Sequence, residues 1–393
     1  MNKNVWLLFC CQALLNAIMA GQVVMASLIG ESLAVNKLLI TLPMAIQMLA
    51  MMCASIPASM VFARLGRKPG FWLGCLLSLA GSVTYAFGVW YGSFTLYCLG
   101  ALPAGMGWGI GQHLRFAAAE VAAPEARARA ISLVMAGGVL AAIIGPELVK
   151  RTNMLVPPLE FLGTYLCLTI LPVLAAILLV FVTVPPIVRG EGTPVPFRTI
   201  IARPNFITAA VCSMVGYGTM NLVMASTPVE MAFCGLGVGA SADVIRAHSI
   251  AMFLPGFITG RLIQRFGVHR IILAGGGLAL LCAAINIAFV PAYLTFMVAL
   301  VLLGVGWNFM FVGGTTLLTT SYVPAERVRV QATNDFIVFG TVACTTLLSG
   351  AVQATVGWTP LNLTLVPPVI VAVALIAWHW TSRANPSMSL RGA

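Results

Sequence analysis

Long apolar runs recur from one end of this chain to the other, and they restrict its fold more than any other feature. A helix rises about 1.5 Å per residue, so about 20 apolar residues cross the hydrocarbon core of a bilayer. Only 8% of the residues are charged, whereas a soluble domain carries about 25%. We therefore predict an all-α membrane protein with twelve transmembrane helices. The runs that predict them are 5–28, 37–62, 71–90, 94–116, 131–150, 160–183, 206–230, 246–263, 271–290, 293–319, 331–352 and 360–380.

The sequence also repeats itself at an offset of about half its length. An Arg-x-Gly turn separates two apolar runs at Gly66 and again at Gly267, 201 positions later. Two other motifs repeat in the same order: Pro-Glu-Ala-Arg at 124 with Pro-Ala-Glu-Arg at 324, and Gly-Met-Gly-Trp at 105 with Gly-Val-Gly-Trp at 304. Three motifs in one register indicate a duplicated chain, so we predict two pseudo-symmetric six-helix bundles.

A polar stretch rich in proline and glycine marks the boundary between the predicted halves. We predict an N-terminal bundle over 1–183, a cytoplasmic linker over 184–205, a C-terminal bundle over 206–380 and a cytoplasmic tail over 381–393.

The formal net charge of +11 would also suit a protein that binds nucleic acid. We exclude nucleic acid as a partner, because the cations lie in short loops between apolar runs and not on one soluble face. With the N-terminus placed in the cytoplasm, sixteen of the 21 Lys and Arg residues fall on the cytoplasmic side. Cytoplasmic loops of membrane proteins carry this excess. We predict a multi-pass protein of the cell inner (plasma) membrane with both termini in the cytoplasm.

Motifs for metal, cofactor or enzyme chemistry are missing from the sequence. The ten cysteines form no C-x-x-C and have no histidine at metal-ligand spacing. H-E-x-x-H, G-x-S-x-G and the nucleotide-binding G-x-x-x-x-G-K-[ST] are also missing. We predict no metal, no cofactor and no enzymatic activity.

The twelve runs in two halves, the central linker and the repeated Arg-x-Gly turn resemble the major facilitator superfamily of secondary transporters. The loop motif of that family runs roughly Gly-x-x-x-Asp-Arg-x-Gly-Arg-Arg. The first copy here matches it at Arg64, Gly66, Arg67 and Lys68 and has Ala63 in place of the acid; the second matches at Gly260, Arg265 and Gly267 and has Gln264 in place of the acid. The resemblance implies a monomer in the bilayer that exposes a central site to each side in turn.

The resemblance also implies a gate at the repeated turns. In the family the first turn packs near the start of the eleventh helix, where this chain has Asp335. We expect Asp335 to supply the acid that position 63 lacks, by pairing with Arg64 or Arg67 when the cytoplasmic side is closed. Gly66, Arg265 and Gly267 complete the expected gate. The alternative is that the loop cations only fix the topology and that Asp335 faces water.

In this superfamily the first, fourth, seventh and tenth helices line the substrate path. Polar and aromatic residues stand on each of the four corresponding runs: Gln12 and Asn16, Trp108 and Gln112, Tyr217 and Asn221, and Trp307, Asn308, Phe311 and Thr315. The alternative for each is helix–helix hydrogen bonding or ordinary packing. This set suits a small, flat, neutral or weakly charged organic solute. Some vitamin carriers of the superfamily, among them bacterial riboflavin carriers, move such solutes, so riboflavin uptake is our candidate.

Coupling and alternatives are less constrained. Glu147, after Gly145-Pro146, is our coupling candidate, and facilitated diffusion stays open. Arg115 could hold an anion, pair with Glu120 or extend to the membrane surface. A partial antiporter motif, Ala141-x-x-x-Gly145-Pro146, leaves drug or metabolite efflux by proton antiport as the second candidate. A receptor or scaffold that transports nothing is the candidate of another class.

Overall fold

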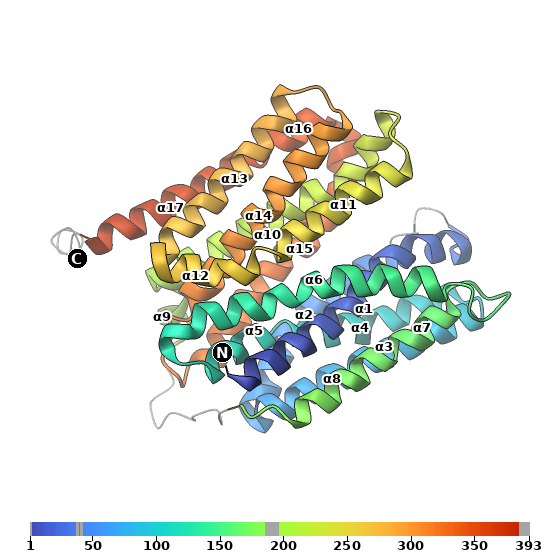
Figure 1. The fold of residues 1–393 in the computed structure, drawn as a ribbon, viewed down its shortest axis with the longest axis horizontal. Helices are drawn as coiled ribbons and strands as arrows, with labels where there is room; N and C mark the ends of the chain where they lie inside the picture. The colour runs from blue at the N-terminus through green and yellow to red at the C-terminus, as the bar shows by residue number, and fades with distance from the viewer. Residues whose placement is uncertain (1, 37–38, 40–41, 185–195, 385–393) are drawn as a thin grey trace. The chain divides into compact units, whose positions relative to one another are not determined.

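The computed structural model describes residues 2–36, 39, 42–184 and 196–384, and these residues form helices joined by short turns (Figure 1). The α-helices are α1 (Lys3–Leu33), α2 (Leu42–Leu65), α3 (Arg67–Trp90), α4 (Phe94–Gly111), α5 (Leu114–Val121), α6 (Arg127–Thr152), α7 (Leu162–Leu168), α8 (Ile170–Val180), α9 (Phe197–Ile201), α10 (Pro204–Phe233), α11 (Val238–Phe253), α12 (Gly256–Phe266), α13 (Val268–Ala288), α14 (Tyr293–Leu318), α15 (Arg327–Val356), α16 (Trp358–Leu363) and α17 (Val366–Ala384).

Each apolar run of the sequence is helical in the structure. Four runs are covered by two consecutive helices: α4 with α5, α7 with α8, α11 with α12, and α16 with α17. Within the described residues, eight spans are long and apolar enough to cross a membrane, or nine if the bent α2 counts as one span. The runs 94–116, 246–263 and 331–352 fall outside that set; the run 246–263 is divided between α11 and α12.

Contacts between Cα atoms divide the chain into two compact units. Unit 1 comprises Met1–Arg189 with Gln331–Ala343, and unit 2 comprises Gly190–Val330 with Cys344–Ala393. The segment 331–343 of α15 is thus grouped with the first unit, and the predicted division into two six-helix bundles stays a prediction. Of the predicted linker 184–205 and tail 381–393, the parts 185–195 and 385–393 lie outside the described residues.

Each unit is built on a close helix contact at a repeated glycine. In unit 1, α4 contacts α2 where a Cβ on Gly105 would lie 2.2 Å from the backbone oxygen of Gln47. In unit 2, α14 contacts α11 where a Cβ on Gly304 would lie 2.8 Å from the backbone oxygen of His248. Small residues allow helices in membranes to approach to van der Waals contact of their backbones.

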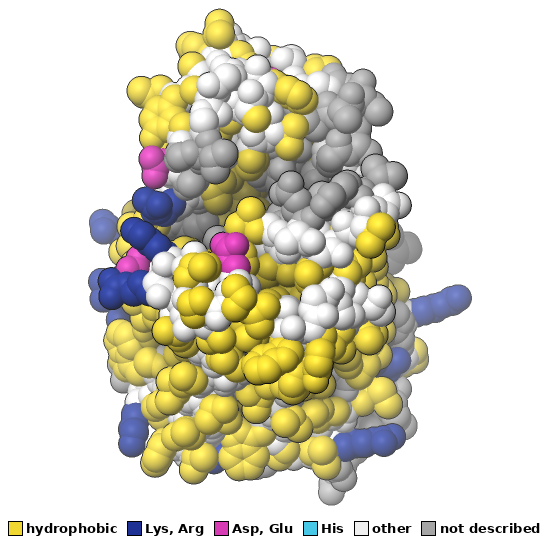
Figure 2. All heavy atoms as spheres, turned by 90° about the vertical axis from the view of Figure 1, so that its right-hand side faces the viewer, with side chains coloured by type: hydrophobic (Ala, Val, Ile, Leu, Met, Phe, Trp, Pro, Cys, Tyr) yellow, Lys and Arg dark blue, Asp and Glu magenta, His cyan; other side chains and the backbone are white. Residues whose placement is uncertain are grey.

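The outer surface of the helices suits a lipid environment. Figure 2 views the helix ends at the right-hand side of Figure 1, where most of the described side chains are hydrophobic. Large apolar side chains such as Leu76, Ile177 and Val371 are 50% exposed or more. A soluble monomer rarely exposes apolar area on this scale, so the surface is that of a membrane protein.

The two Arg-x-Gly turns have the same backbone geometry. Gly66 joins α2 to α3 with φ 91° and ψ 173°, and Gly267 joins α12 to α13 with φ 85° and ψ 149°. A side chain is strongly disfavoured at these angles, so the turn requires glycine. This geometry explains why both copies of the repeat carry glycine at this position.

Replacing Gly66 by alanine is expected to lower the free energy of unfolding by about 1–2 kcal/mol through backbone strain. Among the described residues no atom lies within 4 Å of the Cβ position, so a steric clash does not contribute. Thermal unfolding of the detergent-purified protein measures the effect. Leu65→Ala, at a side chain that is 65% exposed, is the control and should unfold close to wild type. Equal melting temperatures for G66A and wild type would show that the turn adapts without strain.

Candidate functional site

Three polar residues predicted from two different runs come together in unit 1. The indole Nε1 of Trp108 donates a hydrogen bond of 3.0 Å to Oδ1 of Asn16, and Nε2 of Gln112 donates one of 3.4 Å to the same oxygen. Trp108 and Gln112 are one helical turn apart, so both side chains reach the same point on α1. We name Asn16, Trp108 and Gln112 the amide–indole group. Trp108 is its partly exposed member.

Gln12 lies one turn before Asn16 but is not part of that group. Its side chain is 1% exposed, and its Oε1 has no hydrogen-bond partner among the described residues. A buried amide oxygen without a donor is uncommon and costs free energy.

Aromatic residues predicted from α10 and α14 come together in unit 2. The rings of Trp307 and Phe311 are stacked with centroids 5.3 Å apart, and the ring of Tyr217 meets both edge-on at 5.2 and 5.1 Å. We name Tyr217, Trp307 and Phe311 the ring group. Trp307 and Phe311 are buried, and Tyr217 is partly exposed. The Nε1 of Trp307 has no hydrogen-bond partner among the described residues.

The other predicted residues of unit 2 lie apart from the three rings. Asn221 donates hydrogen bonds of 3.1 and 2.8 Å to the hydroxyl groups of Thr345 and Thr346 on α15. Thr315 is 1% exposed, and its hydroxyl has no hydrogen-bond partner among the described residues.

Asn308 differs from the prediction that it lines an open path. It is fully buried, donates to the backbone oxygen of Met252 at 2.7 Å and accepts from the hydroxyl of Thr259 at 2.7 Å. Consecutive residues on a helix point about 100° apart, so Asn308 faces α11 and α12 while Trp307 faces Tyr217. Asn308 therefore joins helices in this structure.

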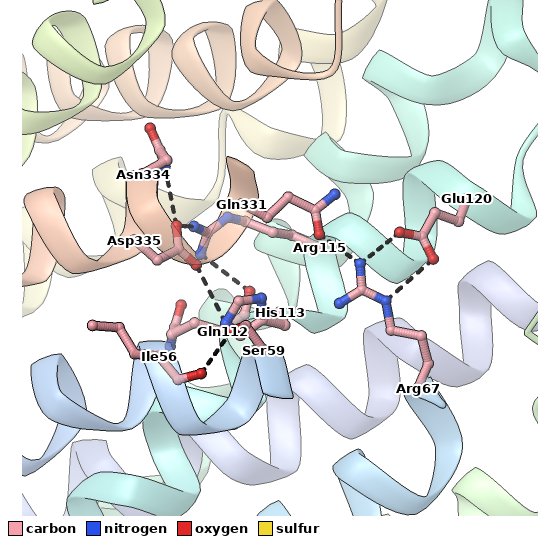
Figure 3. A network of polar contacts seen from close by, with 10 residues as sticks. All are labelled: Ile56, Ser59, Arg67, Gln112, His113, Arg115, Glu120, Gln331, Asn334 and Asp335. Carbon is pink, nitrogen blue, oxygen red and sulfur yellow. Dashed lines mark hydrogen bonds and ion pairs between the residues drawn. The ribbon is translucent and has the colours of Figure 1, made fainter. Parts of the chain in front are cut away.

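A break in the helix follows the amide–indole group. The chain turns at residues 112–113, between α4 and α5, and the freed backbone oxygen of Gln112 accepts a hydrogen bond of 3.1 Å from Nη1 of Arg115. Nη2 of Arg115 donates to Oδ1 of Asp335, and both side chains are 0% exposed (Figure 3). The Nε2 of His113 lies 3.8 Å from Oδ2 of the same carboxylate. Buried charges require such pairing because water cannot solvate them.

The expected partners of Asp335 are corrected by this arrangement. Asp335 was predicted to pair with Arg64 or Arg67, and the structure pairs it with Arg115. Arg67 instead forms an ion pair of 2.6 Å with Glu120 and a hydrogen bond to Gln331, four residues before Asp335 (Figure 3). Glu120, at the end of α5, therefore supplies the acid that position 63 lacks. Asp335 lies one helical turn further along α15 and meets Arg115 there.

The second Arg-x-Gly turn carries no comparable buried cation. Arg265 is exposed and lies over the ring of Phe266, 5.2 Å from its centroid. In unit 2, Arg203 forms an ion pair with Glu326. Its Nη1 and Nη2 donate to the two carboxylate oxygens at 2.5 and 2.8 Å. The hydrogen bonds from Arg203 lower the pKa of the Glu326 carboxyl, which keeps it charged at neutral pH.

Glu147 lies on the surface of α6. Its side chain is 46% exposed and pairs with Arg151 one turn later at 2.6 Å. A surface pair of this kind is well solvated and contributes little.

The sequence did not single out a second buried polar cluster of unit 1. The hydroxyl groups of Tyr97 and Tyr165 are 2.7 Å apart and both bond to the amide of Gln22, while the hydroxyl of Tyr85 donates to Gln47 at 3.1 Å. A cavity beside this cluster is lined by Gln22, Gln47, Ser78, Tyr85, Trp108 and Tyr165, among others. The available signal was polar side chains inside apolar runs: Gln22 and Tyr97 stand in the first and fourth runs, and Tyr85 and Tyr165 in the third and sixth.

Comparisons with known proteins agree with this architecture. The sequence model of the Major Facilitator Superfamily matches residues 6–285. The riboflavin transporter RfnT of Brucella anthropi is 36% identical over 379 residues, which cover 95% of this chain and 94% of that protein. This chain belongs to the major facilitator superfamily.

Two further proteins of the superfamily show lower identity to this chain. The MFS-type transporter YddS of Bacillus subtilis is 28% identical over 336 residues, which cover 81% of this chain and 77% of that protein. The crystal structure of the MFS transporter FucP in the outward conformation matches with a TM-score of 0.77 at 16% identity, over 95% of this chain and 96% of that one. The chain thus has the fold of this superfamily and is a multi-pass membrane transporter for a small molecule.

Proposed function

We propose that this transporter carries riboflavin, or a flat neutral heterocycle very close to it, into the cell. The observation behind the proposal is that unit 1 sets an indole beside two amides in the amide–indole group, and unit 2 gathers three aromatic rings in the ring group. The identity to the riboflavin transporter of Brucella anthropi over 95% of this chain supports it independently.

The chemistry of riboflavin suits these side chains. Its ring system is flat, so it stacks on an aromatic ring, and one ring edge alternates carbonyl oxygens with an N–H. Amide side chains offer both a donor and an acceptor to such an edge. The partly exposed rings are Tyr217 and Trp108, and we assign the stacking contacts to them. Trp307 and Phe311 are buried and hold Tyr217 in position.

The proposal includes the gate expected from the sequence, with changed partners. The Arg-x-Gly turns at Gly66 and Gly267 hold helix ends together, and Arg67 bonds to Glu120 and Gln331. We assign to these contacts the alternation of access between the two sides of the membrane. Asp335 was expected to pair with Arg64 or Arg67; in our proposal its partner in the gate is Arg115.

We further propose that the protein works as a monomer in the cell inner membrane, surrounded by lipid, with both termini in the cytoplasm. Sixteen of the 21 cations fall on that side in this orientation. The solute leaves unchanged, because the role we assign is transport and not catalysis.

Replacing Tyr217 by alanine is expected to weaken riboflavin binding about tenfold, because ring–ring contacts contribute about 0.5–1.5 kcal/mol each beyond area burial. Tyr217→Phe keeps the ring and is the matched control; it should bind within about twofold of wild type. Binding is measured by the rise in melting temperature with riboflavin concentration and by exchange of labelled riboflavin across proteoliposomes.

Three results would contradict the proposal in different ways. If Tyr217→Ala binds riboflavin as tightly as wild type does, the ring group is not part of the binding site. A shift of the melting temperature with lipophilic cations but not with flavins would favour efflux of drugs or metabolites. Binding without any exchange across the membrane would favour a receptor.

A further inference from the structure

The carboxylate of Asp335 is the most deeply buried acid that the structure describes, and one of its two oxygens has no hydrogen bond there. Its Oδ1 accepts from Arg115 and, at 3.0 Å, from Nδ2 of Asn334. Its Oδ2 has no hydrogen-bond partner among the described residues. A buried, charged oxygen without a donor is costly, and a proton on that oxygen would remove the charge.

The imidazole of His113 lies close to Oδ2 of Asp335 and also lacks hydrogen bonds within the described residues. His113 is 1% exposed, and neither of its ring nitrogens has a hydrogen-bond partner in the described part of the chain. Its Nε2 lies 3.8 Å from Oδ2 of Asp335, too far for a hydrogen bond and near enough to form one after a small movement (Figure 3). The rings of Phe62 and Phe116 pack against the imidazole and separate it from water.

Arg115 keeps other contacts that do not depend on Asp335. It donates to the backbone oxygen of Gln112, and its guanidinium lies 4.6 Å from the centroid of the Phe116 ring. Broken helices inside membranes commonly form ion sites, because the break frees backbone groups to bind charge. The break at 112–113 therefore holds the cation in place while its carboxylate partner changes charge.

These contacts lead directly to the amide–indole group. Gln112 gives its backbone oxygen to Arg115 and its side-chain amide to Asn16. A change in the position of Arg115 is therefore passed to Gln112 and Asn16 through two hydrogen bonds, all within unit 1.

We propose that Asp335 is the proton-binding residue that couples solute movement to the proton gradient; this inference rests on the proposed function. The proton binds Oδ2 from water on the side to which the site is open and leaves to the other side, while Arg115 stays charged throughout. The charged and polar groups that act on Asp335 are Arg115 of α5, His113 at the break, Asn334 of α15 itself and the charge of Arg67 of α3, which is paired with Glu120.

Protonation changes which conformation is favoured. With Asp335 charged, the segment 331–343 of α15 is held by two contacts, Asp335 with Arg115 and Gln331 with Arg67. With Asp335 neutral, the first contact loses its charge–charge attraction, and burial of the Arg115 cation becomes less favourable. The protonated protein therefore favours a state in which Arg115 gains water or solute.

The test uses the fact that riboflavin carries no net charge. Wild-type protein in sodium-free proteoliposomes should exchange labelled riboflavin without a gradient, accumulate it several-fold when the lumen is more alkaline than the medium, and produce a current on addition of riboflavin. Asp335→Asn should still exchange labelled riboflavin, because exchange needs no net movement of protons, and should lose both the accumulation and the current. Glu147→Gln removes the surface carboxylate and is the control; it should behave as wild type.

The outcomes separate the two proposals. No exchange of riboflavin by wild type would overturn the proposed function. Exchange by wild type together with accumulation by Asp335→Asn would overturn the coupling role and leave the function standing. If His113→Gln loses accumulation and Asp335→Asn keeps it, the proton-binding group is the imidazole of His113 and the assignment to Asp335 is wrong. Loss of exchange as well in a folded Asp335→Asn would show that the residue acts only in the gate and would overturn the coupling assignment.

A second variant covers the case in which Asp335→Asn does not fold. Asp335→Glu keeps the carboxylate and moves it along the side chain by one methylene. It should still accumulate riboflavin, with a changed pH for half-maximal stimulation. An unchanged pH profile would contradict the assignment.

Discussion

Replacing Arg115 by methionine is expected to lower the free energy of unfolding by about 3–5 kcal/mol, because the Asp335 carboxylate is then buried without its cation. Methionine fills part of the same space, so the loss reports the charge and not a cavity. The apparent melting temperature of the detergent-purified protein should fall clearly at neutral pH. The melting temperature of Asp335→Leu should fall in the same way, because this variant leaves the cation of Arg115 buried without the Asp335 carboxylate.

The double variant Arg115→Met with Asp335→Leu tests the reason for this loss. Replacing a buried ion pair by apolar side chains of similar volume is often neutral or stabilising, so most of the stability should return. Arg151→Met, in the exposed pair with Glu147, is the control and should leave the melting temperature nearly unchanged. Additive losses in the double variant would show that the two side chains act independently.

Replacing Gly105 by alanine is expected to cost about 3 kcal/mol or more, at the upper end of what overpacking of a core costs. The added Cβ would lie 2.2 Å from the backbone oxygen of Gln47, and a backbone atom cannot turn away as a side chain does. The helices α2 and α4 would have to separate. Lowered expression and a lower melting temperature measure the effect.

The repeat provides graded comparisons for this variant. Gly304→Ala, at the corresponding position of unit 2, brings the Cβ to 2.8 Å from a backbone oxygen and should cost less. Gly277 on α13 has no atom within 4 Å of its Cβ position among the described residues, and alanine there should stabilise the helix by about 0.5–1 kcal/mol. Equal stability of the Gly105 and Gly277 variants would contradict a close α2–α4 contact.

Part of the candidate site was predictable residue by residue. Tyr217 with Phe311 and Trp307, and Asn16 with Trp108 and Gln112, were named from their spacing and meet in the structure. Asn308 was named with them but bonds to Met252 and Thr259 on α11 and α12, because sequence spacing gives the face of a helix but not the neighbour that covers it. Whether these residues bind the solute stays a prediction.

The ion pairs were not predictable in the same way. Asp335 and Arg115 are 220 residues apart, and Arg67 and Glu120 are 53 apart. Several arrangements of four charged residues satisfy the sequence equally well. The choice between them depends on how far along α15 each residue lies when the helix packs against α3 and α5.

The sequence by itself determined the helical membrane fold, its duplication and its family. Bilayer thickness fixes the length of each apolar run, lipid leaves the backbone of each run no alternative to a helix, and the Arg-x-Gly turn needs glycine at both copies. Only the tertiary structure decided which charges are buried together, since the free energy of a buried charge depends on the atoms within a few ångströms of it. For that reason the acid inferred to carry the proton is Asp335, beside Arg115, and not Glu147 on the surface.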